Sequence, residues 1–320
     1  MLWSLFMCIV YIALVTVAAG YIFGVPVAIR AYGKAAIASV SKRGWKKKVQ
    51  SEDFKLSSTI TNEFEWTPDA GNLAAYSKVL GVQAKCIEKF GEIPVLYPQT
   101  QMFMSLIERL CEADYPFPLL GMVHVSNFVR QERALRVDET FTSKFKVCEA
   151  VRNSKRGTIV EYQSHLVDAE GLIPWTSTMT VLHVHRNPLT PDDVKNAIEV
   201  PVEGDDVVEK PFLLAESAGR KYAAVSGDYN PIHMHGMLAK LMGFRKAIAH
   251  GLYTIGTVNA EIMNTTPAKF PIVTQAYFKR PAFLPSKNVV RTQVRTDGTA
   301  FSVNSSEGIC LVEGEIMHAK

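Results

Sequence analysis

Cysteine is scarce in this 320-residue chain, and the spacing of its cysteines excludes several kinds of site. The 5 cysteines form no Cys-x-x-Cys pair, so neither a disulfide scaffold nor a zinc or redox motif is indicated. The sequence also lacks a Gly-x-Gly-x-x-Gly run and a phosphate-binding loop, which argues against a nucleotide or redox cofactor. We therefore expect reduced thiols, a reducing compartment, and chemistry that needs no cofactor.

Charge is missing from one long stretch, because no charged residue occurs from Leu2 to Ile29. Only basic residues follow before the first acid, Glu52: Arg30, Lys34, Lys42, Arg43, Lys46, Lys47 and Lys48. Without these seven, 28 basic residues face 31 acidic ones. This near-neutral body carries no basic footprint for nucleic acid, and no nucleic-acid partner is predicted.

The uncharged run has the length of a membrane span, since about 20 apolar residues suffice to cross the hydrocarbon as a helix. We predict a transmembrane anchor at residues 1–30, with membrane contact through 2–29, and a basic juxtamembrane linker at 31–55. The positive-inside rule then gives a single-pass protein whose body is cytosolic, at the endoplasmic reticulum or another internal membrane. A cleaved signal peptide is the alternative, because Val17-Ala18-Ala19 is an acceptable cleavage site.

The rest of the chain contains two copies of one unit. Phe117-Pro118 and Phe270-Pro271 each open a strand-like alternating stretch and lie 153 residues apart. At the same offset, Tyr97-Pro98 corresponds to His250-Gly251, and each pair precedes a helical pattern. Each unit is a short helix, a loop, a longer helix and several strands, which predicts an α+β fold with an antiparallel sheet wrapped around a central helix.

The domain boundaries follow from this repeat and from composition. We assign residues 56–187 to an N-terminal repeat, 188–209 to a linker rich in Pro and Asp, and 210–320 to a C-terminal repeat. Only the C-terminal copy carries a polar cluster, within Gly227–His233; the N-terminal copy has Gly81-Val82-Gln83-Ala84-Lys85 there. This asymmetry predicts a catalytic second repeat and a chemically silent first repeat.

The polar cluster is suited to proton transfer. Asp228 and Asn230 are turn formers, and Pro231 fixes the chain just before His233, so a short loop can bring a carboxylate and an imidazole to one place. An acid and a base beside one water are what general acid–base catalysis requires. The alternative is structural: Asp228 only caps a helix that begins at Pro231, and His233 is a buried histidine of the core.

A glycine at the start of the long helix in the second copy adds an electrostatic element. The N–H of Gly251 has no helical partner at a helix N-terminus, so it can stabilise an oxygen that becomes negative during reaction. A simple tight turn is the alternative. In the first copy Pro98 occupies this position and has no N–H to donate. His233, His235 and His250 could also be considered as metal ligands. No third ligand stands at the spacing of a metal-binding motif, so no metal is predicted.

Two segments resemble the motifs of a known family, the (R)-specific enoyl-thioester hydratases, also called the MaoC-like or hydratase 2 group. They are YAAVSGDYNPIH, Tyr222–His233, and GFRKAIAHGL, Gly243–Leu252. The body from about residue 56 resembles the two-repeat members of this family, bacterial (3R)-hydroxyacyl-thioester dehydratases with a double hot dog fold. The resemblance is strong over residues 211–285 and weak over the first repeat.

This resemblance implies a reaction and a role for each residue of the motifs. The reaction is reversible hydration of a trans-2-enoyl thioester to a (3R)-3-hydroxyacyl thioester, carried by coenzyme A or acyl carrier protein. Asp228 and His233 are then the catalytic pair, Asn230 and His250 orient them, and the Gly251 N–H is the oxyanion donor. No redox cofactor is needed.

The acyl chain and the partners complete the expectations. Met102, Phe103 and Leu106 on the central helix of the first repeat, together with Tyr229, are expected to line an acyl-chain tunnel. A stripe of Met and Phe is also how ordinary cores fill gaps, so a purely structural interpretation stays open. Beside the acyl thioester, a second copy of the chain and other enzymes of fatty acid metabolism are expected partners.

Two other classes of function use the same scaffold. A thioesterase would activate water at the thioester carbonyl with a carboxylate, and the Asp-x-Asn-Pro-x-His spacing disfavours it. A non-catalytic acyl-thioester-binding protein would need no polar cluster, as the silent first repeat illustrates, and the intact second cluster disfavours that hypothesis.

Overall fold

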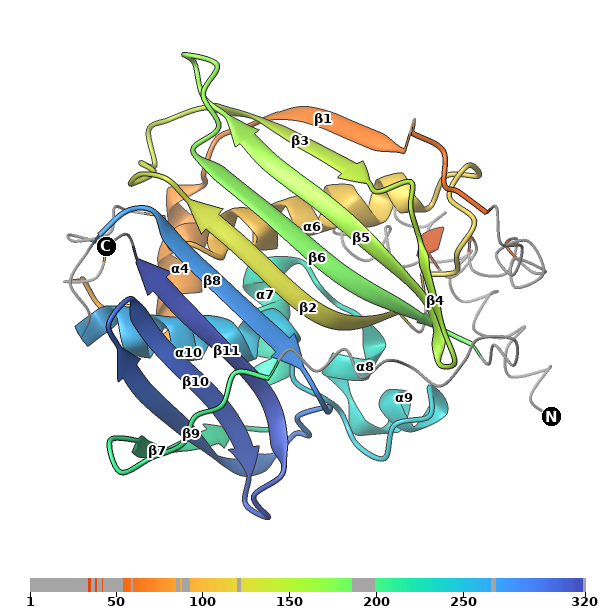
Figure 1. Cartoon of the computed structure of the whole chain (residues 1–320). Helices are drawn as coiled ribbons and strands as arrows, with labels where there is room; N and C mark the ends of the chain where they lie inside the picture. Colours follow the sequence, from red (N-terminus) through yellow and green to blue (C-terminus); the bar gives the residue numbers. More distant parts are fainter. Residues whose placement is uncertain are drawn as a thin grey trace.

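The computed structural model describes residues 54–318 except 59, 85–86, 88–92, 120–121, 186–198 and 266–268, and also residues 34, 35, 38 and 42. The described strands form one antiparallel sheet (Figure 1). They are β1 (Thr61–Trp66), β2 (Met122–Gln131), β3 (Phe141–Val147), β4 (Arg152–Ser154), β5 (Gly157–Val167), β6 (Trp175–Val184), β7 (Val208–Leu214), β8 (Ile272–Phe278), β9 (Ser286–Arg295), β10 (Gly298–Ser305) and β11 (Cys310–His318). The helices are α4 (Ala70–Leu80), α6 (Tyr97–Leu110), α7 (Ala218–Ser226), α8 (Pro231–Met234), α9 (Gly236–Leu241) and α10 (Gly251–Thr265).

The strand order of the sheet is palindromic. It runs β1-β3-β5-β6-β2-β8-β11-β10-β9-β7, with β4 paired to β5 outside this path. The two halves therefore have the same internal order, and they meet where β2 pairs antiparallel with β8. This is the arrangement of two α+β repeats that the sequence predicts. The strand β7 begins at Val208, so the boundary predicted at residue 210 falls inside a strand.

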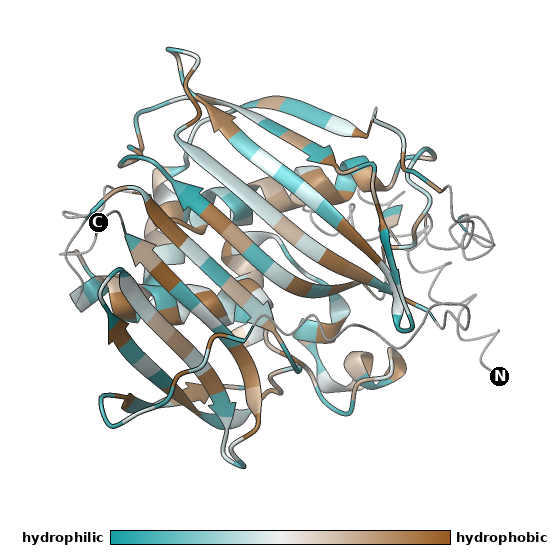
Figure 2. Cartoon of the chain, in the orientation of Figure 1, coloured by the Kyte–Doolittle hydropathy of each residue, from teal (hydrophilic) through white to brown (hydrophobic). Residues whose placement is uncertain are grey.

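The helices lie on one face of this curved sheet, and each half has its own long central helix, α6 or α10 (Figure 1). Strands show mixed hydropathy along their length (Figure 2), because alternate side chains point to the helices and to solvent. In β3, for example, Phe141, Ser143, Phe145 and Val147 are buried and the residues between them are not.

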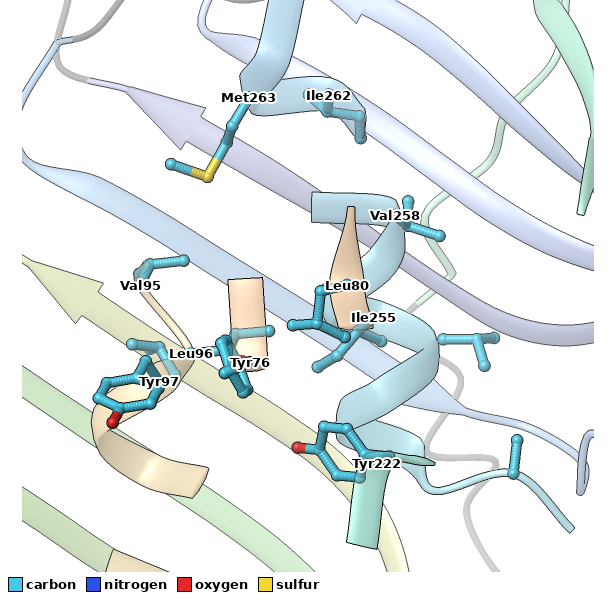
Figure 3. Packing of buried hydrophobic residues seen from close by; sticks show 14 of the residues in the cluster. Tyr76, Leu80, Val95, Leu96, Tyr97, Tyr222, Ile255, Val258, Ile262 and Met263 are labelled. Carbon is cyan, nitrogen blue, oxygen red and sulfur yellow. The ribbon is translucent and has the colours of Figure 1, made fainter. Parts of the chain in front are cut away.

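The two halves share one hydrophobic core (Figure 3). Tyr76 of α4 and Tyr222 of α7 occupy equivalent places in the two repeats, and their rings lie 6.4 Å apart. Helix α4 also approaches α10 closely, since a Cβ on Gly256 would lie 2.9 Å from Leu80 Cδ1. Burial of apolar surface from both repeats in one cluster makes them a single packing unit, so each repeat supports the geometry of the other.

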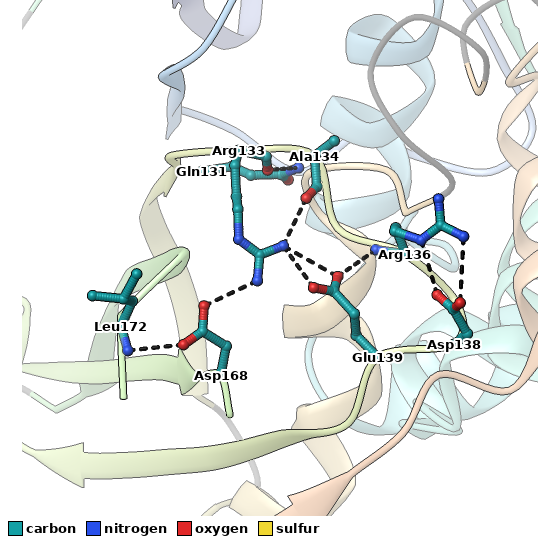
Figure 4. Close-up of polar contacts among 8 residues, drawn as sticks. All are labelled: Gln131, Arg133, Ala134, Arg136, Asp138, Glu139, Asp168 and Leu172. Atoms are coloured by element: carbon teal, nitrogen blue, oxygen red, sulfur yellow. Dashed lines mark hydrogen bonds and ion pairs between the residues drawn. The ribbon is translucent and has the colours of Figure 1, made fainter. Parts of the chain in front are cut away.

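Ion pairs hold one end of the first repeat (Figure 4). The Arg133 guanidinium lies 2.8 Å from Glu139 and 3.0 Å from Asp168, whose side chain is only 5% exposed. The Asp168 carboxylate also accepts from the Leu172 N–H at 2.8 Å. These contacts tie the loop after β2 to the turn between β5 and β6, and we assign them a structural role.

The prediction of a single-pass membrane protein with a cytosolic body needs correction. Among the described residues, no helix is long and apolar enough to cross a membrane. The segment 2–29, on which the anchor was predicted, and most of the basic linker at 31–55 lie outside the described residues. The predicted location, a single-pass membrane protein with a cytosolic body, is therefore wrong.

Candidate active site

The acidic residue of the site sits in a short loop between α7 and α8. Helix α7 ends at Gly227, whose φ of 73° is the left-handed conformation that favours glycine. The Asp228 carboxylate accepts from the N–H of Asn230 at 3.1 Å, which fixes its direction. Asn230, rather than Asp228, caps α8, because its side-chain oxygen accepts from the Ile232 N–H. The alternative in which Asp228 is only the cap of this helix is therefore wrong.

Two histidines lie beside this carboxylate, each held by one backbone carbonyl. His233 Nδ1 donates to the Ile248 carbonyl at 2.8 Å, and His250 Nε2 donates to the Asp228 carbonyl at 2.9 Å. A carbonyl oxygen only accepts, so these contacts place the proton of each ring. His233 is left with an unprotonated Nε2, the form that a general base needs. The two rings stack with their centroids 3.8 Å apart.

The three predicted groups thus converge. One ligand-type atom from each of Asp228, His233 and His250 lies within 4.8 Å of the others. His233 and His250 are 9% and 2% exposed. His235, the other histidine considered for a metal set, is exposed, and its Nδ1 accepts from the Met237 N–H at the start of α9. The three groups that could hold a cation here are thus Asp228, His233 and His250, and His235 is not one of them.

Burial keeps both imidazoles neutral at neutral pH. Loss of hydration lowers the pKa of His233, while the Asp228 charge and the Ile248 carbonyl act in the opposite direction. For His250, burial and the neighbouring His233 lower the pKa to about 3. The site therefore presents one carboxylate beside two neutral rings, an arrangement that accepts a proton from a bound water.

Gly251 is the first residue of α10, and its N–H has no hydrogen-bond partner among the described residues. This free donor points from the positive end of a 15-residue helix. A Cβ here would lie 2.8 Å from the Phe278 ring, so any larger residue would have to displace that ring. In the first repeat, α6 begins with Tyr97-Pro98, and proline offers no such donor.

Comparison with known proteins identifies the family. The MaoC like domain matches residues 192–307. Over 236 residues the chain is 30% identical to 3-hydroxyacyl-thioester dehydratase X of Mycobacterium tuberculosis. The aligned segment covers 71% of this chain and 77% of that protein. The chain belongs to the MaoC-like dehydratase family. It is thus an enzyme of the hydro-lyase class with a dehydratase or hydratase role in fatty acid metabolism.

Solved structures agree on the fold of this MaoC-like dehydratase. The crystal structure of HtdX from Mycobacterium tuberculosis superimposes with a TM-score of 0.67 at 25% identity, covering 81% of this chain and 100% of that one. A MaoC-like dehydratase from Phytophthora capsici gives 0.67 at 20% identity, covering 84% and 98%. A further Mycobacterium tuberculosis protein, described as a double hot dog fold, gives 0.51 at 13% identity, covering 80% and 95%. The predicted double hot dog is confirmed.

Three of the residues expected to line a tunnel lie in the first repeat of this MaoC-like dehydratase, and the fourth, Tyr229, lies in the second. Met102 and Leu106 are buried and Phe103 is partly buried, and all three border a cavity of about 20 Å³ between α6 and the sheet. A space of that size holds about one water. Tyr229 is partly buried in the loop between Asp228 and Asn230. The tunnel stays a prediction.

Two residues near the site of this MaoC-like dehydratase were not found from its sequence. His124 of β2 belongs to the silent repeat, yet its ring lies 4.6 Å from that of Phe278, the residue that a Cβ on Gly251 would contact. Burial lowers the pKa of His124 to about 4, and the nearby Asp228 charge acts in the opposite direction. Gly219 of α7 packs on the catalytic loop, since a Cβ there would lie 2.0 Å from the His233 carbonyl oxygen. Neither residue lies in a motif. The sequence offered one signal for Gly219: an Ala-Gly pair opens both α4 and α7, at the same place in the two repeats.

Proposed function

We propose that this chain catalyses the reversible hydration of trans-2-enoyl thioesters to (3R)-3-hydroxyacyl thioesters. The observation that carries the proposal is the convergence of the Asp228 carboxylate with the imidazoles of His233 and His250. Directly after His250, α10 begins with the unpartnered N–H of Gly251. Asp228, His233 and the Gly251 N–H would supply the three chemical elements that such a reaction needs: a base for water, a second proton carrier and a donor for the developing oxyanion.

In the hydration direction, a water binds between Asp228 and the unprotonated Nε2 of His233. These groups take a proton from the water as its oxygen forms a bond to C3. The electron pair of the double bond moves toward the thioester, whose oxygen accepts from the Gly251 N–H. A proton from the same pair of groups is then delivered to C2, so one water is added in total. Dehydration follows the same steps in reverse.

His250 and Asn230 are positioning residues in this proposal. The His250 N–H holds the Asp228 carbonyl, and its ring stacks on His233, so it fixes both members of the pair. The backbone N–H of Asn230 orients the Asp228 carboxylate, while its side chain starts α8, the helix that carries His233. Neither residue needs to exchange a proton with substrate.

The test is to mix the full chain with trans-2-enoyl thioesters of several chain lengths, on coenzyme A and on acyl carrier protein. The absorbance of the conjugated thioester and the release of free thiol are followed together. Loss of absorbance without thiol supports the proposal and shows which carrier is used. Thiol release would favour the thioesterase, and no reaction on any substrate would favour the binding protein.

The pH dependence of the reaction is predicted from the buried histidine. Because burial lowers the pKa of His233 from its ordinary 6.5, the ring stays unprotonated at mildly acidic pH. We expect kcat/KM to stay level from about pH 8 down through that ordinary value and to fall only below it. A pH–rate profile checks this, and an acidic limb centred above 6.5 would contradict it.

The chain-length preference is predicted to depend on the cavity beside α6. Met102→Ala should enlarge this space and raise kcat/KM for long acyl chains relative to short ones, by about 10-fold for two methylenes. Leu110→Ala is the matched control, since Leu110 is buried on the same helix outside the cavity. The same profile in both variants would show that α6 does not line the acyl chain.

A further inference from the structure

The two repeats meet at one pair of strands, and the end of this pair lies beside the active site. Strand β2 of the first repeat pairs with β8 of the second from Gln131 to Ser126, where Ser126 faces Tyr277. The register of β2 then shifts between His124 and Ser126 against β6. A bulge of this kind redirects the side chains next to it. His124 lies two residues beyond the last pair, on the far side of this irregularity from Ser126.

The redirected His124 packs on a residue of the second repeat. Its ring lies 4.6 Å from the Phe278 ring, centroid to centroid, with the planes tilted by 43°. Its Nε2 donates to the Ser126 carbonyl at 3.1 Å, a contact across the bulge that fixes the direction of the ring. His124 therefore forms a fixed support behind Phe278.

Phe278 in turn lies against the start of α10. It is the last residue of β8, and its ring atoms Cε1 and Cζ would be 2.8 and 2.9 Å from a Cβ on Gly251. The contacts thus form a chain in which His124 of the first repeat touches Phe278, and Phe278 lies against Gly251. Phe278 is only partly buried, so the ring has space to turn if its support is removed.

The surroundings of His124 keep it neutral. Burial lowers the pKa of His124 to about 4, while the Ser126 carbonyl, Asn127 and the Asp228 carboxylate act in the opposite direction. Asn127 is itself fixed, because its side-chain oxygen accepts from Gln99 of α6 at 2.6 Å. A neutral ring beside a fixed neighbour is suited to packing.

We propose that His124, supplied by the silent repeat, is a positioning residue for the oxyanion donor: it holds Phe278 against Gly251 and so fixes the direction of the Gly251 N–H. The inference rests on the proposed function of Gly251 and deepens it. The first repeat then contributes to catalysis through packing, without a proton-transferring group of its own. Because the thioester oxygen gains charge only in the transition state, misplacement of this donor lowers kcat more than it changes KM.

The experiment compares His124→Ala with His124→Phe in the full chain. The alanine variant removes the support, and we expect kcat to fall by about 10–100-fold with KM within about 2-fold, less than the loss of a whole oxyanion donor. The phenylalanine variant restores a ring against Phe278 and should recover most of kcat. His165→Ala on β5 of the same repeat is the control and should match the native chain, since His165 is not part of this contact.

A second measurement does not depend on activity. In chains labelled with ¹⁵N-glycine, the Gly251 amide resonance should shift in His124→Ala and return toward its native position in His124→Phe. Unchanged kcat and an unmoved Gly251 resonance in His124→Ala would overturn the proposal, and so would a phenylalanine variant as slow as the alanine variant. If the native chain hydrates no enoyl thioester, the proposed function fails, and the Gly251 resonance still decides whether His124 positions that amide.

Discussion

Asp228→Asn is expected to lower kcat for enoyl-thioester hydration by about 10²–10⁴-fold with little loss of stability. The amide cannot accept a proton from water, but its oxygen can still accept the Asn230 N–H that orients the native carboxylate. The loop should therefore keep its shape. Steady-state kinetics together with the urea midpoint of unfolding separate the lost chemistry from lost folding.

Asp205→Asn provides the matched control for this variant. This substitution makes the same change of charge at an exposed position of the linker, just before β7, so its turnover should equal that of the native chain. Near-normal turnover in Asp228→Asn would show that the carboxylate does not take part in the reaction, and the assignment of the site would fail with it.

Gly219→Ala is expected to be the most damaging of the small substitutions near the site. A Cβ at this position would lie 2.0 Å from the carbonyl oxygen of His233 and 3.0 Å from its carbonyl carbon, and both of these atoms belong to the backbone. Helix α7, or α8 which carries His233, must then move, because a backbone carbonyl cannot turn away as a side chain can. We expect a loss of stability of about 1–3 kcal/mol or more, and a fall of kcat of about 10²-fold from the displaced histidine.

The first repeat offers a control for this substitution. Gly71 is also the second residue of its helix, α4, and a Cβ there would meet only the Asp69 carboxylate at 3.2 Å. Gly71→Ala should therefore leave both stability and kcat close to native. Equal effects of the two substitutions, measured by thermal unfolding and by turnover, would refute the close backbone contact at Gly219.

The sequence predicted the repeat because short motifs recur at one offset of 153 residues, and it predicted the polar cluster because its members are close together in the chain. Asp228, Asn230 and His233 lie within six residues, in the loop before α8 and on α8 itself, and His250 and Gly251 stand at the start of α10. Spacing and turn chemistry therefore indicate each of these two groups separately. The same spacing could not show that the His250 ring stacks on His233, because that contact depends on how α7, α8 and α10 pack.

The residues that sequence reasoning missed owe their position to contacts between distant segments. His124 reaches the site through the β2–β8 pairing and a bulge, and β2 and β8 belong to different repeats. A side chain at Gly219 would collide with the His233 carbonyl, and this close approach exists only because α7 packs on α8. Neither pairing of strands nor close approach of helices is encoded in a local pattern of hydrophobicity.

The configuration of the product tests the proposed reaction and the assignment of its catalytic groups together. The native full chain is incubated with a trans-2-enoyl thioester that it consumes, and the 3-hydroxyacyl product is resolved by chiral chromatography. Groups that are fixed in one site add water to one face of the double bond, so a single enantiomer is expected. The resemblance of Tyr222–His233 to the (R)-specific hydratases predicts that this enantiomer is (3R). A (3S) or racemic product, or a product without added water, would contradict this prediction.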